Sequence, residues 1–520
     1  MYLYVLLAFA LLVGLRQPAF DPPWGGFWPA AGWAVGLTVG LILLAAALAA
    51  EALRRLQRDP GRPHDAQLFH HRSTLAIRAI LLAGFAGLLY LTRWGAFFAS
   101  EPFARIPGAG ELLAGLPFFV TLVLTWLVQY RIDRALRQVA IGQRQWESPT
   151  AARVWSLGEY LLFNLRHQLL VIAVPMLLIV AAYDWVHLYE EALAVQFGAP
   201  WAADAVLACF SAGVFVIAPV MLRYLWPTSR LPDGPLRERL EALCGRLNLR
   251  CRDILVWHSG GMMVNAAVMG LFAPVRYVLL SDALLDAMDT PRIEAVFGHE
   301  VGHVRHRHIP YFVLFALASM FIVTAIMEVL AWLSSGPRAV LSLNLWAIEA
   351  IGVLCAVLIW GIGFGWVSRR FEWQADLFGA RTVTPPVDDC PRPCSVHAAE
   401  RPLLPAAVCA TGAAIFASSL HRVARLNGIP LDERSWRHSS IGHRIRRLVR
   451  LASDPLAATK FDRQIQRIKF TLIATVVLGG LAGGLHYLGD RAAQRVDRRP
   501  ALVDLPERAA VDARVELPRR

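Results

Sequence analysis

Two histidines four residues apart, with a glutamate directly after the first, are the residues of this chain whose types and spacing best fit catalytic chemistry. His299 and His303 lie in the run HEVGH. On a helix this spacing places both imidazoles on one face, where both can bind one Zn²⁺ ion. Glu300 is then placed to act as a general base. A hydrophobic helix can contain this pattern by chance, so a zinc site requires a third ligand.

The run SRRFEWQADLFGA, about seventy residues further on, offers that ligand. Glu372 and Asp376 are four residues apart and share a helix face, so Glu372 can complete a His₂Glu zinc site while Asp376 orients a ligand imidazole. Such a site holds one zinc per chain and leaves the fourth position for water, which Glu300 would deprotonate before attack on a peptide carbonyl. The alternative is an amphipathic helix with ordinary surface carboxylates.

The order of HEVGH, an apolar hairpin and SRRFEWQAD resembles the membrane gluzincins, the family of zinc metalloproteases that includes the CAAX prenyl proteases and the heat-shock membrane proteases. The resemblance covers roughly residues 231–451. It implies a zincin-like peptidase domain and a polypeptide substrate.

Two further runs match this family. VNAAVMG resembles its edge-strand motif, which implies that Asn265 and Ala266 lie beside an extended substrate that adds to the sheet as a strand. RHSSIGHRIRRL resembles its His-Pro-Ser and Arg-Ile element, which implies that His438 and Arg444 lie near the site. Either His438 or Arg444 is then the candidate donor to the oxyanion. Ser439 stands where the family has proline, so the local turn differs. The alternative for this run is a solvated basic helix.

The composition indicates a polytopic membrane protein. Of 520 residues, 56% are hydrophobic and only 18% are charged, and the mean hydropathy is +0.45. A helix needs about 20 apolar residues to cross a bilayer. Eight stretches approach this length, and an opening run at residues 1–14 is short, so eight or nine spans are expected. The stretches are residues 27–52, 74–95, 112–130, 168–186, 205–226, 309–333, 342–367 and 470–488.

The arginines predict the orientation of these spans, because positively charged loops stay in the cytoplasm. Arginines gather after the first, third and fifth full-length spans, whereas residues 183–204 contain only acidic charges. Both polar regions of the candidate site, residues 227–308 and 369–468, are therefore predicted to face the cytoplasm from the cell (inner) membrane. This rule also explains the net charge of +13, and no motif indicates nucleic-acid binding.

The predicted fold is mainly α, a multi-pass transmembrane helical bundle with a cytoplasmic α+β zincin-like metalloprotease domain. We expect a membrane region at 1–226, a peptidase domain at 227–468 interrupted by a transmembrane hairpin at about 309–367, and a hydrophobic segment with an Arg-rich tail at 469–520. Strand-like runs at 253–257 and 277–280 follow an amphipathic helix near 236–247. Thr290 is the expected N-cap of the HEVGH helix, with Pro291 at its first position.

Seven cysteines show no disulfide framework. Cys390 and Cys394, in DDCPRPC, could bind metal or cross-link, but a zinc ribbon needs a second pair, which is missing. The favoured interpretation is a loop with two thiols.

The sequence therefore predicts a membrane-embedded zinc endopeptidase that hydrolyses membrane-associated or misfolded proteins, with Glu300 as general base. The alternative is a catalytically inactive zinc-binding membrane scaffold or transporter, which would not need Glu300. The family resemblance leaves two substrate classes open, prenylated C-termini and damaged membrane proteins.

Overall fold

The chain forms two compact units. The computed structural model describes residues 3–14, 26–100, 103–144, 154–261, 263–335, 340–385, 390, 396–397, 408–433 and 435–497. The first unit joins Met1–Arg307 with Phe371–Lys460, and the second joins His308–Arg370 with Phe461–Arg520. The division into 1–226, 227–468 and 469–520 expected from the sequence stays a prediction.

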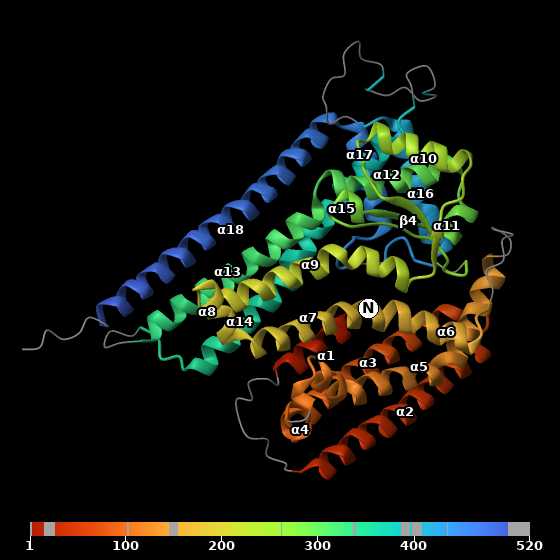
Figure 1. The fold of residues 1–520 in the computed structure, drawn as a ribbon. Coiled ribbons are helices and arrows are strands. Elements are labelled where there is room, and N and C mark those ends of the chain that lie inside the picture. The colour runs from red at the N-terminus through yellow and green to blue at the C-terminus, as the bar shows by residue number, and fades with distance from the viewer. Residues whose placement is uncertain are drawn as a thin grey trace, which may run out of the picture. The chain divides into compact units, whose positions relative to one another are not determined.

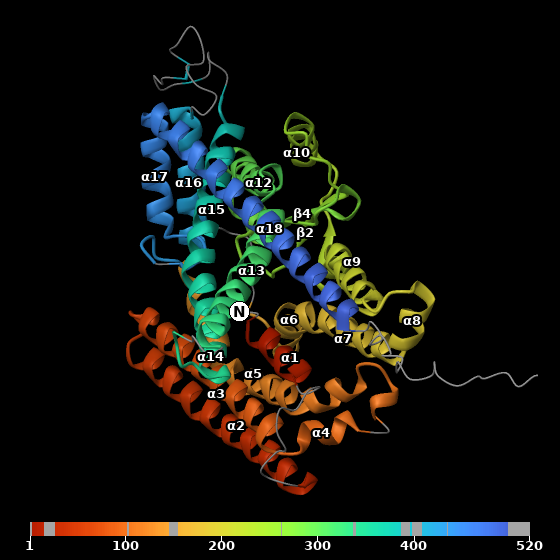
Figure 2. The ribbon, with the colours of Figure 1, turned by 90° about the vertical axis from the view of Figure 1, so that its left-hand side faces the viewer.

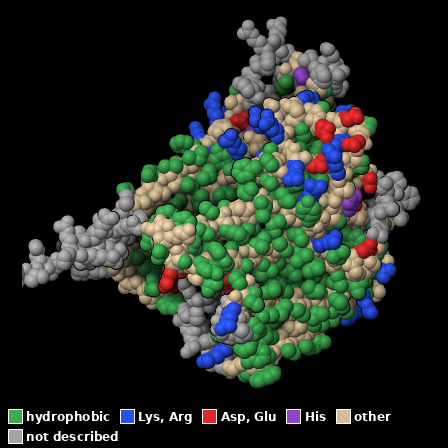
Figure 3. All heavy atoms as spheres, viewed as in Figure 1, with side chains coloured by type: hydrophobic (Ala, Val, Ile, Leu, Met, Phe, Trp, Pro, Cys, Tyr) green, Lys and Arg blue, Asp and Glu red, His purple; other side chains and the backbone are tan. Residues whose placement is uncertain are grey.

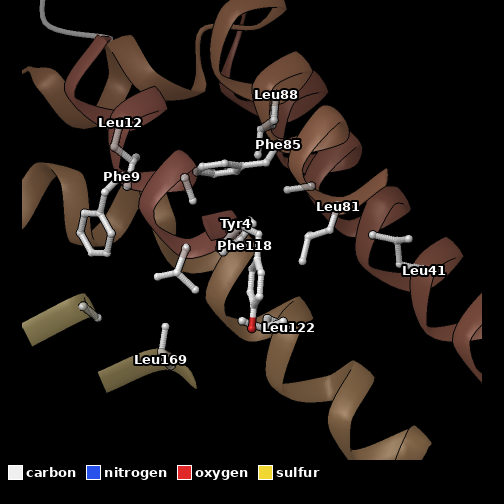
Figure 4. Close-up of a cluster of buried hydrophobic side chains, with 14 of the residues drawn as sticks. Tyr4, Phe9, Leu12, Leu41, Leu81, Phe85, Leu88, Phe118, Leu122 and Leu169 are labelled. Atoms are coloured by element: carbon white, nitrogen blue, oxygen red, sulfur yellow. The ribbon is translucent and has the colours of Figure 1, made fainter. Parts of the chain in front are cut away.

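The N-terminal part of the first unit is a bundle of helices (Figure 1). Its elements are α1 (Leu3–Gly14), α2 (Phe27–Arg58), α3 (Pro63–Leu91), α4 (Trp94–Ala99), η1 (Phe103–Arg105), α5 (Ala109–Arg144), α6 (Leu157–Asn164), η2 (Leu165–Leu170), α7 (Val171–Leu188), α8 (Glu190–Phe197) and α9 (Ala202–Leu225). Helices α2, α3 and α5 pack on one another. Figure 4 shows Phe9 of α1, Phe85 of α3 and Phe118 of α5 among the side chains of the apolar core of the bundle, where the ring centroids of Phe85 and Phe118 are 5.2 Å apart. Close van der Waals packing of such side chains holds together helices that cross a membrane, because the surrounding lipid tails are as apolar as the core.

Eight helical segments of the described residues are long and apolar enough to cross a membrane, which confirms the predicted number. They are Phe27–Arg58, Pro63–Leu91, Ala109–Val139, Leu157–Leu188, Ala202–Leu225, His308–Ser334, Leu345–Thr382 and Leu456–His486, and Tyr4–Gly14 is a shorter apolar helix. Figure 3 shows hydrophobic side chains over the long helices, with many charged side chains around α10 (Pro235–Arg246) and α17 (Ile441–Ser453). The protein is a multi-pass membrane protein.

A small sheet follows the bundle in the first unit. Its strands are β1 (Thr228–Arg230), β2 (Asp253–Trp257), β3 (Ala266–Met269) and β4 (Tyr277–Ser281), in the order β1-β2-β4-β3. Strands β2 and β4 are parallel, whereas β1 and β3 pair antiparallel at the two edges. The predicted strands at 253–257 and 277–280 are confirmed, and β3 is an edge strand, as the family resemblance implied.

Alternate residues of the central strands pack on opposite sides of the sheet. On one side Ile254 and Val278 join a core built with α10, α12 and α16. On the other side Leu255 and Leu279 pack with residues that precede the sheet. The sheet is therefore covered on both faces. The helices of this part of the chain are α10, α11 (Asp282–Ala287), α12 (Thr290–Arg305), α16 (Ala410–Leu426) and α17, and the short η3 (Ala273–Val275) lies between β3 and β4.

The second unit contains the predicted hairpin. Its helices are α13 (His308–Ser334), α14 (Leu345–Leu358), η4 (Ile359–Phe364), the first part of α15 (Gly365–Thr382) and most of α18 (Pro455–Asp497). Helix α13 packs against α14. Phe315 of α13 contacts Phe364 with ring centroids 5.6 Å apart. The second part of α15 belongs to the first unit and carries Glu372.

Candidate metal centre

Helix α12 begins one residue earlier than the sequence indicated. Asp289 is the N-cap, Thr290 is the first helical residue and Pro291 lies in the first turn. The prediction of Thr290 as N-cap was wrong because Asp289 and Thr290 are both good capping types, and a proline is accepted at either of the first two positions of this helix. The shift does not alter the spacing of the histidines.

Two glycines let α12 approach α15 closely. A Cβ atom on Gly298 would lie 2.7 Å from side-chain atoms of Thr382, and one on Gly302 would lie 3.1 Å from Cβ of Phe378. A larger residue at either position would push the helices apart. The HEVGH face is thereby held against the carboxylates of α15.

His299, His303 and Glu372 form a compact triangle of ligand atoms. The two Nε2 atoms are 3.3 Å apart, and Glu372 oxygens lie 3.7 Å from Nε2 of His299 and 3.6 Å from Nε2 of His303. Ligands of tetrahedral zinc, at about 2.0–2.2 Å from the ion, are separated by roughly 3.3–3.6 Å. The donor types and their separations therefore fit one zinc ion.

A buried ion pair lies behind the triangle. Nδ1 of His299 lies 3.0 Å from Oδ1 of Asp376. Arg444 of α17 donates from Nε to Oδ2 of Asp376 at 2.9 Å and also bonds Oδ1, and it lies 3.6 Å from Glu372. A carboxylate on the second ring nitrogen sets the tautomer that leaves Nε2 free for a metal. Arg444 thus has the geometry of a positioning residue that acts through Asp376.

The surroundings shift the pKa values of Glu300 and His303 in opposite directions. Burial raises the pKa of Glu300 to about 7, and the Glu372 carboxylate adds to this, while the backbone N–H of Val268 and Arg444 oppose it. A pKa near neutrality suits a general base. Burial lowers the pKa of His303 to about 4, so its imidazole is neutral, the form that binds metals.

His438 reaches the same group in spite of the missing proline. Its Nδ1 lies 3.0 Å from Oε1 of Glu372, and half of its side chain is exposed. The next residue, Ser439, has φ of 67°, a left-handed conformation that proline cannot adopt. The local turn therefore differs from the family pattern, yet His438 still lies beside the candidate ligand.

A pocket of about 360 Å³ joins these residues to the edge of the sheet. Its lining includes all the predicted site residues except Asp376, namely Asn265, Ala266, His299, Glu300, His303, Glu372, His438 and Arg444. Phe416, Leu420 and Val423 of α16 form an apolar wall; Figure 2 shows α16 and α17 side by side. The pocket can hold part of a polypeptide next to the metal ligands.

The edge of β3 opposite β4 faces this pocket, and Ala266 is part of the lining. The Asn265 carbonyl accepts a hydrogen bond from the Ser281 N–H at 2.9 Å, and the Asn265 N–H donates to Oγ of Ser281 at 3.0 Å, so both main-chain groups of Asn265 face Ser281. In an antiparallel ladder the next residue, Ala266, then directs its N–H and C=O away from β4. An extended peptide could pair with these groups.

Two residues that hold this edge were missed by the sequence analysis. The Asn427 side chain accepts from the Val264 N–H at 3.1 Å and donates to the Val264 carbonyl at 2.9 Å. Asp282 accepts from the N–H groups of Ser259, Gly260 and Gly261. In the sequence, Asn427 followed by Gly428 indicates only the end of a helix. Nothing nearby indicates its hydrogen bonds with Val264.

His306 does not continue the metal-binding face. It is the C-cap of α12, and its ring packs on Phe378 with centroids 5.6 Å apart. Arg307, with φ of 56°, ends the helix before α13 begins.

Arg444→Met should weaken metal binding without touching a ligand. The change leaves the buried Asp376 carboxylate without its guanidinium, so we expect about 3–5 kcal/mol of destabilisation and about 10–100-fold weaker zinc affinity. Thermal unfolding and zinc titration of the purified protein measure both effects. Arg446→Met is the matched control, since Arg446 is on the same helix and its ion pair with Asp432 is exposed. Unchanged zinc affinity in a folded Arg444→Met protein would refute the positioning role.

Comparison with known proteins agrees with this geometry. The model of peptidase family M48 matches residues 231–429. The chain is 28% identical over 209 residues to a CAAX prenyl protease 1 homolog of Arabidopsis thaliana, covering 36% of this chain and 47% of the relative. It is 31% identical over 153 residues to a protease HtpX homolog of Pyrobaculum calidifontis, covering 29% and 44%. These matches span less than half the length of the two relatives.

Among solved structures, Ste24p of S. mikatae aligns with 84% of this chain and 100% of its own, with a TM-score of 0.44 and 14% identity. The matches to the family model and to the curated relatives confirm the predicted resemblance to the membrane metalloproteases of this family.

Proposed function

We propose, starting from the peptidase family M48 domain in residues 231–429, that this membrane protein is a zinc-dependent endopeptidase. The observation that carries the proposal is the group formed by His299, His303 and Glu372, whose ligand atoms all lie within 4.8 Å of one another. Glu300 lines the same pocket. A zinc site kept only for stability would not need a buried carboxylate beside an open ligand position.

His299, His303 and Glu372 would hold the zinc, which when bound polarises the scissile carbonyl and makes water a stronger acid. Glu300 accepts the proton of the attacking water and returns it to the leaving amine. Asp376 and Arg444 orient His299. His438, beside Glu372 and half exposed to the pocket, is the candidate donor to the developing oxyanion.

The substrate is a polypeptide bound in extended form along β3. Main-chain pairing at Ala266, with Asn265 beside it in the pocket lining, tolerates many side chains, which suits an enzyme that acts on varied membrane-associated or misfolded proteins. Prenylated C-termini are the second candidate class, in line with the printed name of the Arabidopsis relative.

Metal removal and replacement test the proposal. A chelator should abolish cleavage of an unfolded polypeptide by the purified full chain, and added zinc should restore it. His303→Ala and Glu372→Ala should each lose about one zinc ion per chain, because each removes one of three protein ligands. His306→Ala is the control, since His306 caps the same helix and packs on Phe378. Undiminished zinc and cleavage in both ligand variants would overturn the proposal, and a zinc-loaded wild type that cleaves nothing would favour the scaffold.

The catalytic domain is proposed to face the cytoplasm from the cell (inner) membrane. A reporter inserted after Trp226 should report the cytoplasm, and one near Glu190 the opposite side, because arginines flank the first position and acidic residues surround the second. Reversed signals from the two reporters would show that the site faces outward and meets a different pool of substrates.

A further inference from the structure

A second group of metal-binding side chains lies where the chain enters α16. Sγ of Cys409 is 3.7 Å from Sγ of Cys390 and 3.8 Å from Nδ1 of His397, and the three ligand atoms lie within 4.8 Å of one another. None of the three is among the described residues that line the pocket. Cys394, which the sequence analysis paired with Cys390, lies outside the described residues.

The separations fit a shared metal better than a cross-link. A disulfide joins two sulfurs at about 2.05 Å. Two thiolates on tetrahedral zinc, each about 2.3 Å from the ion, are roughly 3.8 Å apart, and a thiolate and an imidazole nitrogen are roughly 3.6 Å apart. The observed 3.7 and 3.8 Å lie close to these values. We propose that Cys390, His397 and Cys409 supply three of the ligands of a second zinc ion, distinct from the catalytic one.

The fold fixes one of these ligands firmly. Cys409 is the N-cap of α16 and is only 1% exposed. A Cβ atom on Gly412 would lie 2.4 Å from the Ala380 carbonyl oxygen, so the first turn of α16 packs directly on the end of α15. The positive end of a 17-residue helix favours a negatively charged thiolate at this position.

A hydroxyl supports the second thiol. Oγ1 of Thr411 lies 3.2 Å from Sγ of Cys390, within reach of a hydrogen bond to sulfur. Such bonds around a metal orient its ligands. The start of α16 therefore positions two sulfur atoms: Cys409 carries one of them, and Thr411 contacts the other, Sγ of Cys390.

The position of the group suggests its role. The segment between Thr382 and Ala410 has no helix or strand in its described residues, and a metal on Cys390, His397 and Cys409 would tie it to the start of α16. The same helix supplies Phe416 to the wall of the pocket and ends at Asn427, which pairs with Val264. The ion would thus stabilise the helix that shapes the pocket.

Zinc counting on the full chain, purified under reducing conditions, tests the site. We expect about two zinc ions per wild-type chain, instead of the one that the catalytic site alone predicts, and about one in Cys409→Ser or His397→Ala. His303→Ala should also hold about one, and the double variant Cys409→Ser/His303→Ala almost none. Cys209→Ser, a change to an exposed cysteine of α9, is the control and should keep both ions.

Cobalt substitution separates this proposal from the catalytic one. A thiolate bound to Co²⁺ gives an intense charge-transfer absorption, and the group of His299, His303 and Glu372 contains no sulfur. The band should persist in His303→Ala, since it does not depend on the catalytic site, and disappear in Cys409→Ser. If Cys409→Ser fails to fold, Cys390→Ser and His397→Ala alter less buried residues and give the same readout.

Two results would overturn the second site. One is a wild-type protein with about one zinc per chain and no thiolate band after cobalt loading. The other is a Cys390–Cys409 disulfide, found by mass spectrometry of protein whose free thiols were alkylated before any reductant was added.

Discussion

Glu300→Gln is expected to lower kcat for peptide cleavage by about 10²–10⁴-fold while the protein keeps its zinc. Glutamine preserves the shape of the side chain but cannot accept the proton of the attacking water. Glu300 is adjacent to His299 and lines the pocket. The proposed metal ligands are His299, His303 and Glu372, so Glu300 is not one of them. Activity and metal content should therefore respond differently to this one change.

Glu294→Gln is the matched control, because Glu294 lies on the same helix and pairs with Arg239 at 2.8 Å. Its variant should cleave at close to the wild-type rate. Full zinc occupancy together with undiminished cleavage in the Glu300→Gln protein would reject the mechanism. The slow variant also retains substrate, so polypeptides that co-purify with it would distinguish prenylated proteins from damaged membrane proteins.

The parts of the site that follow from helix periodicity could be predicted from the sequence. A spacing of four residues places His299 beside His303, and Glu372 beside Asp376, wherever the two helices lie. The eight apolar helices were also predictable, because a span must satisfy its backbone hydrogen bonds within itself. The pairing of the two motif helices was predicted from the need of a zinc site for a third ligand, and the family resemblance supported it. In the structure Gly298 and Gly302 allow their close approach.

The remaining parts depend on contacts between residues far apart in the chain. Asn427 pairs with Val264 across 163 positions, and Phe416 reaches the pocket from α16, which begins only at Ala410. No local pattern predicts either contact. The second metal group was missed for the same reason: no second cysteine pair accompanies Cys390 and Cys394 in the sequence, and Cys409 lies at the start of α16.

Local geometry explains the smaller differences. The N-cap prediction failed by one residue because two capping types are adjacent at Asp289 and Thr290. Ser439 was expected to change the turn, and it takes a positive φ that proline forbids. The family resemblance implied that His438 lies near the site, and in the structure its Nδ1 is 3.0 Å from Glu372 in spite of the changed turn.

The edge of β3 leads to the second large effect. Ala266→Pro should lower kcat/KM for peptide cleavage by on the order of 100-fold, because a scissile bond misplaced by about 1 Å reacts that much more slowly. The Ala266 N–H points away from β4, so proline removes a donor to the substrate while the bond between Asn265 and Ser281 remains. Zinc content should stay at the wild-type value, because Ala266 contributes no metal ligand.

Ala266→Gly provides the control, since it keeps the N–H and removes only a methyl group; its kcat/KM should stay within a few fold of wild type. Thermal unfolding and zinc content of each preparation show whether proline has disturbed the sheet. If it has, a substrate peptide methylated at the amide nitrogens next to the scissile bond tests the same pairing on the native enzyme. If substrate adds to β3 as a strand, the Ala266→Pro enzyme should cleave the ordinary peptide poorly, and the wild-type enzyme should cleave the methylated peptide poorly. Wild-type cleavage by a folded, zinc-loaded Ala266→Pro enzyme would show instead that β3 does not bind substrate, and would limit the proposed function to the residues around the metal.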